Sequence, residues 1–410
     1  MKFLHTADLQ IGARFVRFGE KAEVLREARL TTLKRILDLG QENAVDAILI
    51  AGDLFESNQI ADTLVENVFG ILADCPEIPI VILPGNHDPL DGPGCIWQRT
   101  PFSSPPSHVT VCTTRDEVEV AGAIVLPVPI TQKVSTKDPS LPLVESAASA
   151  PKGKIRIGMT HGALAIEGKH QPNDQPIALT AATRAGLDYL ALGHWHKPQA
   201  YDGGRLAMPG TPEPDDFEQD SGSVSLIEIP APGRQPTITP IDCATFAWRS
   251  VTLDLLNREP TPDVVTASMA GGDSPPDRTV LRVELVGPVS AEYREPLAIR
   301  ISEATRDTAV VLVEDKTSTV LSESLWKACL QEHPLLAQVV ADVERSRLFN
   351  TGSPPLTDDA GLAEMTLDEF QSLCGDLNIE SDALREDVFE AMVGLLTGEI
   401  GKAATDGSNP

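Results

Sequence analysis

The stretch DAILIAGDLFE, residues 46–56, carries the pattern that decides the fold. Its apolar run stops at a glycine followed by Asp53, as a buried strand does where it ends in a polar loop. The stretch IPIVILPGNHD, residues 78–88, repeats this plan and leads into Asn86. Between the two, residues 62–72 have the apolar spacing of a helix. This order predicts a strand, a helix and a second strand.

The same alternation extends in both directions from this stretch. KFLHTA at the N-terminus reads as a strand, and residues 21–39 repeat apolar side chains at helical spacing. IRIGMTHG and DYLALGHWH, residues 155–162 and 188–196, are further apolar runs with polar ends. Strands that alternate with helices predict an α/β fold, here with one sheet covered on both faces. Ligand sites in such sheets collect at the carboxyl ends of the strands.

The chain changes character after residue 197. A hairpin is predicted in residues 199–210, around the turn Asp-Gly-Gly, and SVSLIEI at 223–229 is a further strand. Residues rich in Pro and Gly around 258–278 indicate a linker. Two strands that flank a helical stretch at 294–304 then predict a small βαβ unit.

These changes predict four parts of the chain. Residues 1–250 form the main domain, and 251–345 form the linker with a small α+β domain. Residues 356–400 form a helical segment, and 401–410 form a disordered tail. An apolar stripe on the helical segment is predicted to bind a protein partner, and it consists of Leu384, Val388, Met392 and Leu395.

Composition excludes several classes of protein. A hydrophobic content of 41% supports a real core in a chain of 410 residues. No apolar run is long enough to span a bilayer, and the N-terminus meets a charge too early for a signal peptide. The six cysteines are scattered without a C-x-x-C pair, which favours a reducing cytoplasm over a disulfide framework.

The formal net charge of −27 is unusual for a protein that would hold a polyanion. Bound metal ions could supply positive charge locally. The acidity could also reflect adaptation to salt, or a basic partner. The sequence leaves these three explanations open.

Polar side chains gather where five of the predicted strands end. Each alone is weak evidence, since buried histidines are more often structural and Asp or Asn after Gly is common in turns. The set combines oxygen and imidazole donors, which suit Mn²⁺, Fe or Zn²⁺. Its members are Asp8, Gln10, Asp53, Asn86, His87, His161, His194 and His196.

These motifs resemble a known family. In this order and spacing, D-x-Q, GDLFE, GNHD, THG and GHWH are similar to the five motifs of calcineurin-like metallophosphoesterases. With HTAD, LFES and MPGTPEP added, the pattern resembles the SbcD-like DNA repair exonuclease subunits. The motifs cover about residues 1–250. The resemblance implies a β-sandwich flanked by helices, with a small α+β cap and a helical C-terminus.

The resemblance also implies roles for the residues. Asp53 would bridge two divalent metal ions, most simply Mn²⁺. Asp8, Gln10 and His196 would complete one position, and Asn86, His161 and His194 the other. His87 would face the scissile phosphate as general acid or charge stabiliser, with Asp88 orienting or charging it. A hydroxide held between the ions would attack phosphorus.

Gln10 departs from the family pattern, because most members have His at this position. An amide oxygen can bind a metal, and it suits Mn²⁺ or Mg²⁺ better than zinc. Alternatively, Gln10 lies behind the ligands and water takes its place. His5, His108, His170 and His333 match no motif and are interpreted as structural or surface residues.

The resulting hypothesis is a cytoplasmic DNA nuclease subunit that hydrolyses phosphodiester bonds. The resemblance implies DNA, a homodimer and an SMC-type ATPase partner of the SbcC kind. No Walker A motif occurs, so ATP would belong to the partner. Two alternatives stay open: a phosphoesterase for small diesters or monoesters, and a weakly catalytic scaffold for DNA or an ATPase.

Overall fold

The structure is a computed structural model that describes residues 1–92, 94–255 and 274–320. Contacts divide the chain into two units. The first comprises residues 1–249 with 277–280, and the second comprises residues 250–276 with 281–410. The predicted helical segment with its apolar stripe, and the predicted C-terminal tail, lie outside the described residues.

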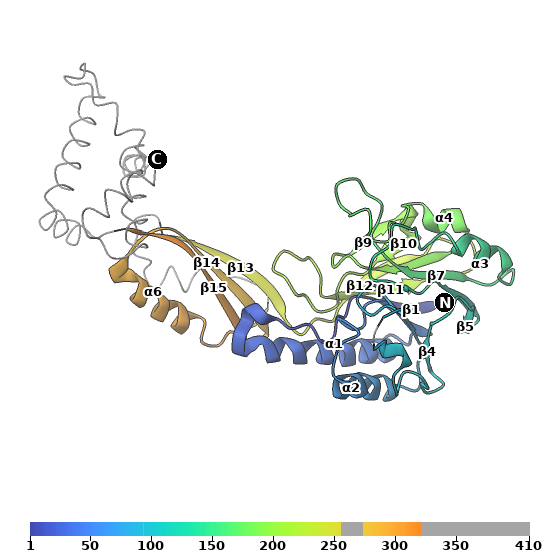
Figure 1. Ribbon diagram of the computed structural model, residues 1–410, viewed down its shortest axis with the longest axis horizontal. Helices are drawn as coiled ribbons and strands as arrows, with labels where there is room; N and C mark the ends of the chain where they lie inside the picture. The colour runs from blue at the N-terminus through green and yellow to red at the C-terminus, as the bar shows by residue number, and fades with distance from the viewer. Residues whose placement is uncertain (93, 256–273, 321–410) are drawn as a thin grey trace, which may run out of the picture. The chain divides into compact units, whose positions relative to one another are not determined.

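The first unit contains two six-stranded sheets (Figure 1). The strands of the first sheet, in spatial order, are β12 (Thr237–Asp242), β11 (Ser223–Glu228), β1 (Lys2–Thr6), β2 (Ala47–Ala51), β3 (Ile80–Leu83) and β4 (Val109–Val111). Those of the second are β5 (Val118–Val120), β6 (Ala123–Pro127), β7 (Arg156–His161), β8 (Tyr189–Gly193), β10 (Leu206–Met208) and β9 (Gln199–Tyr201). Strands β1 to β4 are parallel to one another, as are β6, β7, β8 and β10.

The prediction of one sheet was therefore wrong, whereas the sandwich implied by the resemblance is confirmed. The predicted strands and helices of residues 1–250 are present, and β9 and β10 pair antiparallel as the predicted hairpin. A local apolar pattern specifies a buried strand but does not state which sheet the strand joins. The chain leaves the first sheet after β4 and enters the second at β5.

The two sheets pack face to face over an apolar core. Side chains of both sheets share one cluster, which includes Phe3 and Leu49 from the first sheet and Ile157, Met159 and Tyr189 from the second. Alternate residues of a strand point to opposite faces, so the neighbours of Leu49 along β2 point away from this core. Small residues such as the alanines of β2 and β8 let the sheets approach each other closely.

Helices cover the outer faces of both sheets (Figure 1). Helices α1 (Ala22–Glu42) and α2 (Asp62–Ala73) pack on the first sheet through one cluster, in which Leu33 and Val68 meet Ile48 and Ile80. Helices α3 (Leu143–Ser149) and α4 (Ala181–Ala185) cover the second sheet. The described 3-10 helices of this unit are η1 (Val16–Lys21), η2 (Ile96–Gln98) and η3 (Asp202–Gly204), and η4 (Pro276–Arg278) lies at the boundary between the units.

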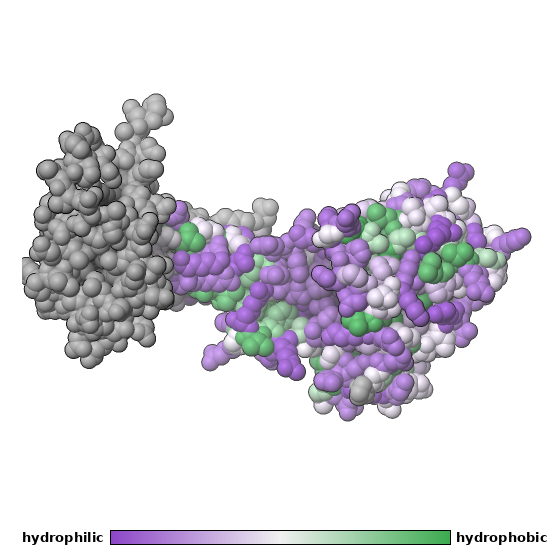
Figure 2. All heavy atoms as spheres, turned by 45° about the horizontal axis from the view of Figure 1, so that its top comes forward, coloured by the Kyte–Doolittle hydropathy of each residue, from purple (hydrophilic) through white to green (hydrophobic). Residues whose placement is uncertain are grey.

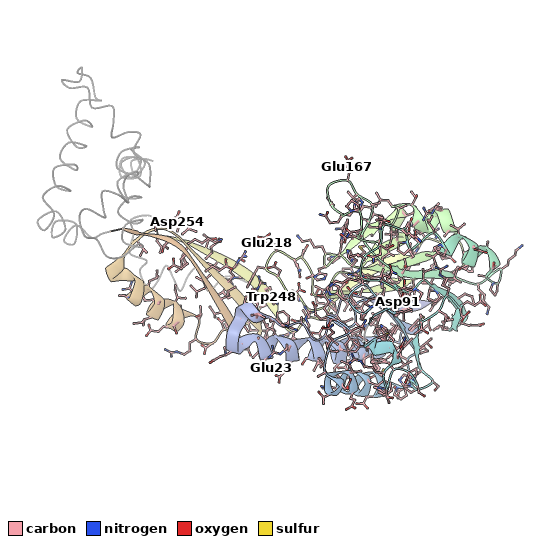
Figure 3. All side chains as sticks on the ribbon, viewed as in Figure 1. Glu23, Asp91, Glu167, Glu218, Trp248 and Asp254 are labelled. Carbon is pink, nitrogen blue, oxygen red and sulfur yellow. The ribbon has the colours of Figure 1, made fainter. Side chains whose placement is uncertain are left out.

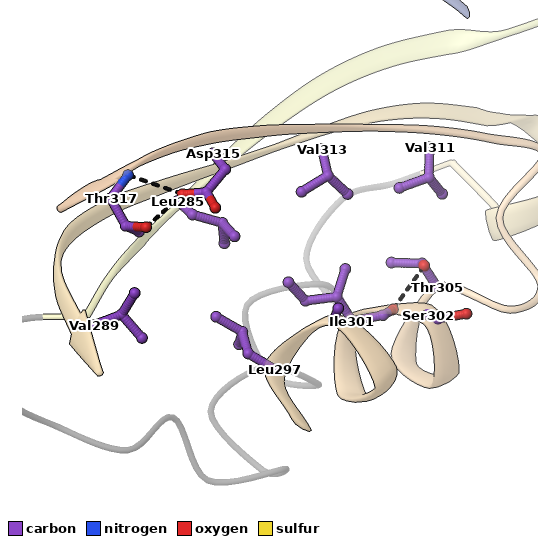
Figure 4. A pocket seen from close by; sticks show the side chains of 11 residues that line it. Leu285, Val289, Leu297, Ile301, Ser302, Thr305, Val311, Val313, Asp315 and Thr317 are labelled. Carbon is purple, nitrogen blue, oxygen red and sulfur yellow. Dashed lines mark hydrogen bonds between the residues drawn. The ribbon is translucent and has the colours of Figure 1, made fainter. Parts of the chain in front are cut away.

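The second unit has a three-stranded sheet and one described helix. The strands are β13 (Ala247–Asp254), β14 (Thr279–Ser290) and β15 (Val310–Val320), and helix α6 spans Ala291–Ala304. An apolar cavity of about 390 Å³ lies between α6 and the sheet, where Leu297 and Ile301 face Leu285 and Val311 (Figure 4). The side chains of α6 and of the sheet thus leave part of the space between them unfilled.

The surface is mainly polar. The face shown in Figure 2 is largely hydrophilic over the described residues, with scattered apolar side chains. None of the described helices has both the length and the apolar character needed to cross a membrane. The described cysteines, Cys75, Cys95, Cys112 and Cys243, are free and buried.

Candidate metal centre

The predicted site residues follow five strands from both sheets. Asp8 and Gln10 follow β1, Asp53 follows β2, and Asn86 to Asp88 follow β3, all in the first sheet. His161 ends β7, and His194 and His196 follow β8, in the second sheet. Parallel strands bring their carboxyl ends to one edge. The packing of the sheets then places both edges beside each other.

The backbone at this edge has unusual conformations. Four of the predicted ligands have positive φ without being glycine: Asp8 at 56°, Gln10 at 44°, Asp53 at 54° and His194 at 113°. Such conformations are uncommon for these residues and persist where surrounding contacts hold them, often at functional sites. Here Asp8 N–H donates to Gly52 O at 3.1 Å and Gln10 N–H to Asp53 O at 2.9 Å. The loops after β1 and β2 therefore hold each other.

Two glycines permit the close approach of the sheets. A Cβ on Gly52 would lie 2.1 Å from Nδ1 of His161, and one on Gly193 would lie 2.6 Å from the carbonyl oxygen of Ala51. Both distances are far below contact distance, so a side chain at either position would push the loops apart. Glycine is required there because one sheet's loop must pass directly over the other's.

Asp8, Asp53 and His161 form the buried centre of the site. One ligand atom from each lies within 4.8 Å of the others, and all three side chains are essentially inaccessible to solvent. His161 Nε2 is 3.3 Å from Asp53 Oδ2 and 3.9 Å from Asp8 Oδ1. Charged groups this deeply buried require a partner of opposite charge.

The orientation of His161 indicates which partner fits. Its Nδ1 lies 2.9 Å from the carbonyl oxygen of Ala51, which can only accept, so Nδ1 carries a proton and donates it. Nε2 then faces the carboxylate of Asp53 and the side-chain oxygen of Asn86 at 2.8 Å. Lone pairs that converge in this way are stabilised by a second proton on the ring or by a cation.

The pKa values describe the first of these states. Burial lowers the pKa of His161, but the charge and hydrogen bond of Asp53 outweigh it and raise that pKa to about 9. Burial also acts to raise the pKa of Asp53, while the positive ring of His161 brings that pKa well below its usual range. The proton thus stabilises the carboxylate where a divalent ion would do so more strongly. Metal binding would displace it.

Asn86 lies between two imidazoles. Its side-chain oxygen is 2.8 Å from His161 Nε2 and 2.9 Å from His194 Nδ1. The backbone N–H of His194 donates to both carboxylate oxygens of Asp8, at 3.0 and 2.9 Å. One amide oxygen therefore contacts two ring nitrogens, and these three atoms are donors that one ion could bind.

Gln10 and His196 contact each other. Gln10 Nε2 is 3.1 Å from His196 Nε2, and the Gln10 side chain is nearly buried. Adjacent ligands of an ion with bonds of 2.0–2.2 Å are separated by roughly this distance. Assignment of oxygen and nitrogen in an amide follows its surroundings, so a bound cation would turn the oxygen of Gln10 toward it. This geometry accommodates Gln10 as a ligand.

His87 stands at the open side of the site. Its backbone N–H donates to Asp53 Oδ1 at 2.8 Å, and its side chain is 28% exposed. Nδ1 of its ring lies 3.1 Å from the carbonyl oxygen of Glu56 and 3.6 Å from the Glu56 carboxylate. The hydrogen bond that His87 donates to Glu56 and the charge of Asp53 together outweigh burial and raise the pKa of His87 to about 9. The ring is thus held in place by Glu56.

Asp88 has a different set of contacts. Its carboxylate accepts the backbone N–H groups of Phe55, at 3.0 Å, and Gly85, at 2.6 Å. Burial and the nearby charge of Asp53 raise its pKa to about 7. These bonds tie the GDLFE loop to the GNHD loop. The acidic group in contact with the His87 ring is instead Glu56.

Sequence reasoning missed two carboxylates at the site, Glu56 and Asp215. Asp215 Oδ1 lies 3.3 Å from His196 Nδ1, and its Oδ2 is 3.1 Å from a nitrogen of buried Arg29. Glu56 is the last residue of the GDLFE motif, and the sequence alone predicts no role for it. Asp215 directly follows the MPGTPEP segment, whose proximity to the ligands was the available signal.

The histidines outside the motifs lie elsewhere. His5 is buried in β1, 2.9 Å from the Tyr189 hydroxyl, and burial lowers its pKa to about 3. His108 and His170 contact backbone carbonyl oxygens. His333 lies outside the described residues.

The part of the chain that carries this geometry is similar to known phosphoesterases. Residues 1–198 match the family model described as calcineurin-like phosphoesterase. An uncharacterized metallophosphoesterase of Bacillus subtilis, YhaO, is 28% identical over 213 residues, which span 48% of this chain and 49% of that protein. A component of the SbcCD nuclease of Rhodobacter capsulatus, its SbcD polypeptide, is 28% identical over 288 residues, or 59% of this chain and 69% of that one.

A third relative is an archaeal protein. The DNA double-strand break repair protein Mre11 of Methanopyrus kandleri is 26% identical over 233 residues, which span 52% of this chain and 49% of that protein. The chain thus spans about half the length of two of these three relatives. The matched segment includes every strand end that carries a predicted ligand. Residues 1–198 are therefore similar to the calcineurin-like phosphoesterase family.

Proposed function

We propose that this protein is a metal-dependent phosphodiesterase that acts on DNA. The observation that carries the proposal is the buried cluster of Asp8, Asp53 and His161, with Gln10, Asn86, His194 and His196 at the strand ends around it. The donor set contains carboxylates, imidazoles and amides but no thiolate, which suits Mn²⁺. Relatives named as part of a nuclease and as a DNA repair protein support DNA as the substrate.

Each residue has a distinct role in this proposal. Asp53 lies between two cation positions, one with Asp8, Gln10 and His196 and one with Asn86, His161 and His194. Two divalent ions held there would activate water and offset the charge of a phosphodiester. They would supply the local positive charge that a protein of net charge −27 otherwise lacks.

His87 would deliver the proton to the leaving oxygen. Its Nδ1 is engaged by Glu56, so Nε2 is the atom that would donate. Asp88 would act indirectly, since its carboxylate joins the two loops that carry Asp53 and His87.

The proposal includes partners. The relative in Rhodobacter capsulatus is by name one component of a nuclease, so we infer an SMC-type ATPase partner of the SbcC kind, together with a second copy of this chain. The stripe of Leu384, Val388, Met392 and Leu395 stays a prediction for the surface that binds the ATPase. DNA repair is the process in which such a complex would act.

The test compares substrates with and without metal. The full chain is assayed with Mn²⁺ on duplex and single-stranded oligonucleotides and on bis-p-nitrophenyl phosphate. Cleavage of DNA that a chelator abolishes supports the proposal. Turnover of the small diester alone would identify a small-molecule phosphodiesterase, and two bound ions without either activity would identify a scaffold. Either result would overturn the assignment to DNA cleavage.

A further inference from the structure

A buried arginine lies behind one of the two cation positions. Arg29, on α1, is 1% exposed and heads the largest fully buried side chains of the described residues. One of its nitrogens donates to the carbonyl oxygen of Leu9, the residue between Asp8 and Gln10. Another lies 3.1 Å from Asp215 Oδ2. A single guanidinium therefore holds the backbone between two predicted ligands and also binds a carboxylate beside a third.

Asp215 links Arg29 to His196, because each of its two carboxylate oxygens contacts one of these side chains. Its second oxygen, Oδ1, lies 3.3 Å from Nδ1 of the His196 ring and accepts a hydrogen bond from Gln219 at 2.6 Å. Gln219 Nε2 also lies 3.3 Å from Nδ1, but its much shorter contact is with Asp215 Oδ1. A carboxylate can only accept, so we place the proton of a neutral His196 ring on Nδ1. Nε2 is then the free ligand atom, and it lies on the side of Gln10, 3.1 Å from that amide.

We propose that Arg29 and Asp215 are a positioning pair for the cation position formed by Asp8, Gln10 and His196. The inference rests on the proposed two-ion function and goes beyond it, because neither residue touches an ion. A carboxylate on the second nitrogen of a histidine ligand fixes its tautomer and orientation and makes it a better donor. Arg29 holds that carboxylate in place through an ion pair of 3.1 Å.

A purely structural role explains these contacts less well. Buried ion pairs contribute little net stability compared with apolar residues of similar volume. Two polar contacts of this pair lead to the predicted ligands: Arg29 reaches the Leu9 carbonyl between two of them, and Asp215 reaches the ring of a third. The other contacts of the pair are with Phe15, Arg17 and Gln219. Asp8 and Gln10 also have positive φ, a conformation that must be held by its surroundings. Arg29 supplies such a hold.

The other cation position has no link to this pair among the described residues. His161 is oriented by the carbonyl of Ala51, and His194 and Asn86 bond to each other. The proposal therefore predicts an asymmetric effect. A substitution that disrupts the pair should lower the affinity for the ion bound by Asp8, Gln10 and His196. The affinity for the other ion should not change.

The first test is Asp215→Asn in the full chain. Mn²⁺ is titrated while unbound Mn²⁺ is followed by electron paramagnetic resonance, which counts ions and needs no turnover. We expect one of two ions to bind about 10–100-fold more weakly, the range for loss of an outer partner, and the other to keep its affinity. Equal weakening of both ions, or of neither, would overturn the proposal.

The matched control is Asp216→Asn. It removes the same charge one residue away, in the loop where Glu218 is labelled in Figure 3. The carboxylate of Asp216 pairs with exposed Arg17 at 3.2 Å, and the ring of His196 is held by Asp215 instead. We expect this variant to bind both ions as the wild type does. A loss equal to that of Asp215→Asn would show that the loop's charge, not the contact, is responsible.

A double variant, Arg29→Met with Asp215→Leu, keeps the test decisive if the single change leaves Arg29 unpaired and impairs folding. Replacing both partners by apolar residues commonly preserves stability. Thermal unfolding checks that it does. Weak binding of one ion in a stable double variant supports positioning, and normal binding of both ions would show that the pair is only structural. A wild type that binds no Mn²⁺ would instead refute the two-ion function itself.

Discussion

The two sheets of the sandwich provide chemically different ligands. The first sheet presents oxygen donors after β1, β2 and β3, from Asp8, Gln10, Asp53 and Asn86. The second presents only imidazoles, from His161, His194 and His196. Each proposed cation position draws on both sheets. The proposed metal centre therefore depends on the packing of the two sheets, since neither sheet alone carries all of its ligands.

The largest effect should follow from Asp53→Asn, which breaks the link between the sheets. The Asp53 carboxylate contacts His161 of the second sheet at 3.3 Å and the His87 N–H of the first at 2.8 Å. Without its charge we expect both ions to be lost, not one, and Mn²⁺-dependent hydrolysis to become undetectable. The measurement is the metal content after gel filtration, beside turnover of bis-p-nitrophenyl phosphate.

Asp91→Asn is the control for that variant. Asp91 is exposed in the loop after the GNHD motif and is labelled in Figure 3. It should retain two ions and full turnover. Two ions retained in Asp53→Asn would show that Asp53 does not bridge.

His87→Ala separates chemistry from metal binding. His87 belongs to the first sheet's oxygen-donor edge, but it is proposed to donate a proton and not to bind an ion. We expect two bound ions and a loss of about 10²–10⁴-fold in turnover, the range for general acid catalysis. Glu56→Gln should cause a smaller loss, since it removes only the charge beside the ring. An ion missing from His87→Ala in calorimetry would reassign the residue to the ligands.

Chelation should destabilise the sandwich. Asp8 and Asp53 are buried charges, and an ion binding only to the folded state would add about 2.7 kcal/mol to the free energy of unfolding at 100 times its dissociation constant. Urea unfolding with Mn²⁺ and with chelator measures this difference. Asp53→Asn is the control, because it should unfold at the same urea concentration in both conditions. If unfolding of the wild type does not depend on Mn²⁺, the metal ions do not stabilise the packing of the two sheets.

Substitutions of Gln10 should change the Mn²⁺ dependence of activity least among these variants. They test directly whether the first sheet contributes this oxygen donor. We expect activity to rise with Mn²⁺ in two phases, of which the second reports the cation position formed by Asp8, Gln10 and His196. Gln10→His places an imidazole on the first sheet, and this second phase should shift to lower Mn²⁺ concentration by about tenfold. Gln10→Ala should shift it by a similar factor the other way. The first phase, from Asn86, His161 and His194, should stay unchanged. Identical curves and ion counts for all three proteins would place Gln10 outside the ligands.

The local pattern predicted most strand ends but not their grouping. Asp53 and His161 each follow an apolar run, and that pattern is the same in either sheet. The grouping depends on pairings with no local signature, such as β1 with β11, where Lys2 faces Glu228. The neighbours of Arg29 along the chain do not indicate that its side chain is buried. The contact of Asp215 with His196 is recognisable only in three dimensions.

The position of β1 has a consequence for the order of folding. β1 lies between β2 and β11. Its hydrogen bonds to β11 involve residues more than two hundred positions later in the chain, so they form only after those residues are in place. Pairings this distant form slowly. Asp8 and Gln10 follow β1 directly, and we expect their geometry to mature only when β11 has joined. Uptake of the second Mn²⁺ during refolding would then be a late kinetic phase, and its rate would report the closure of the first sheet.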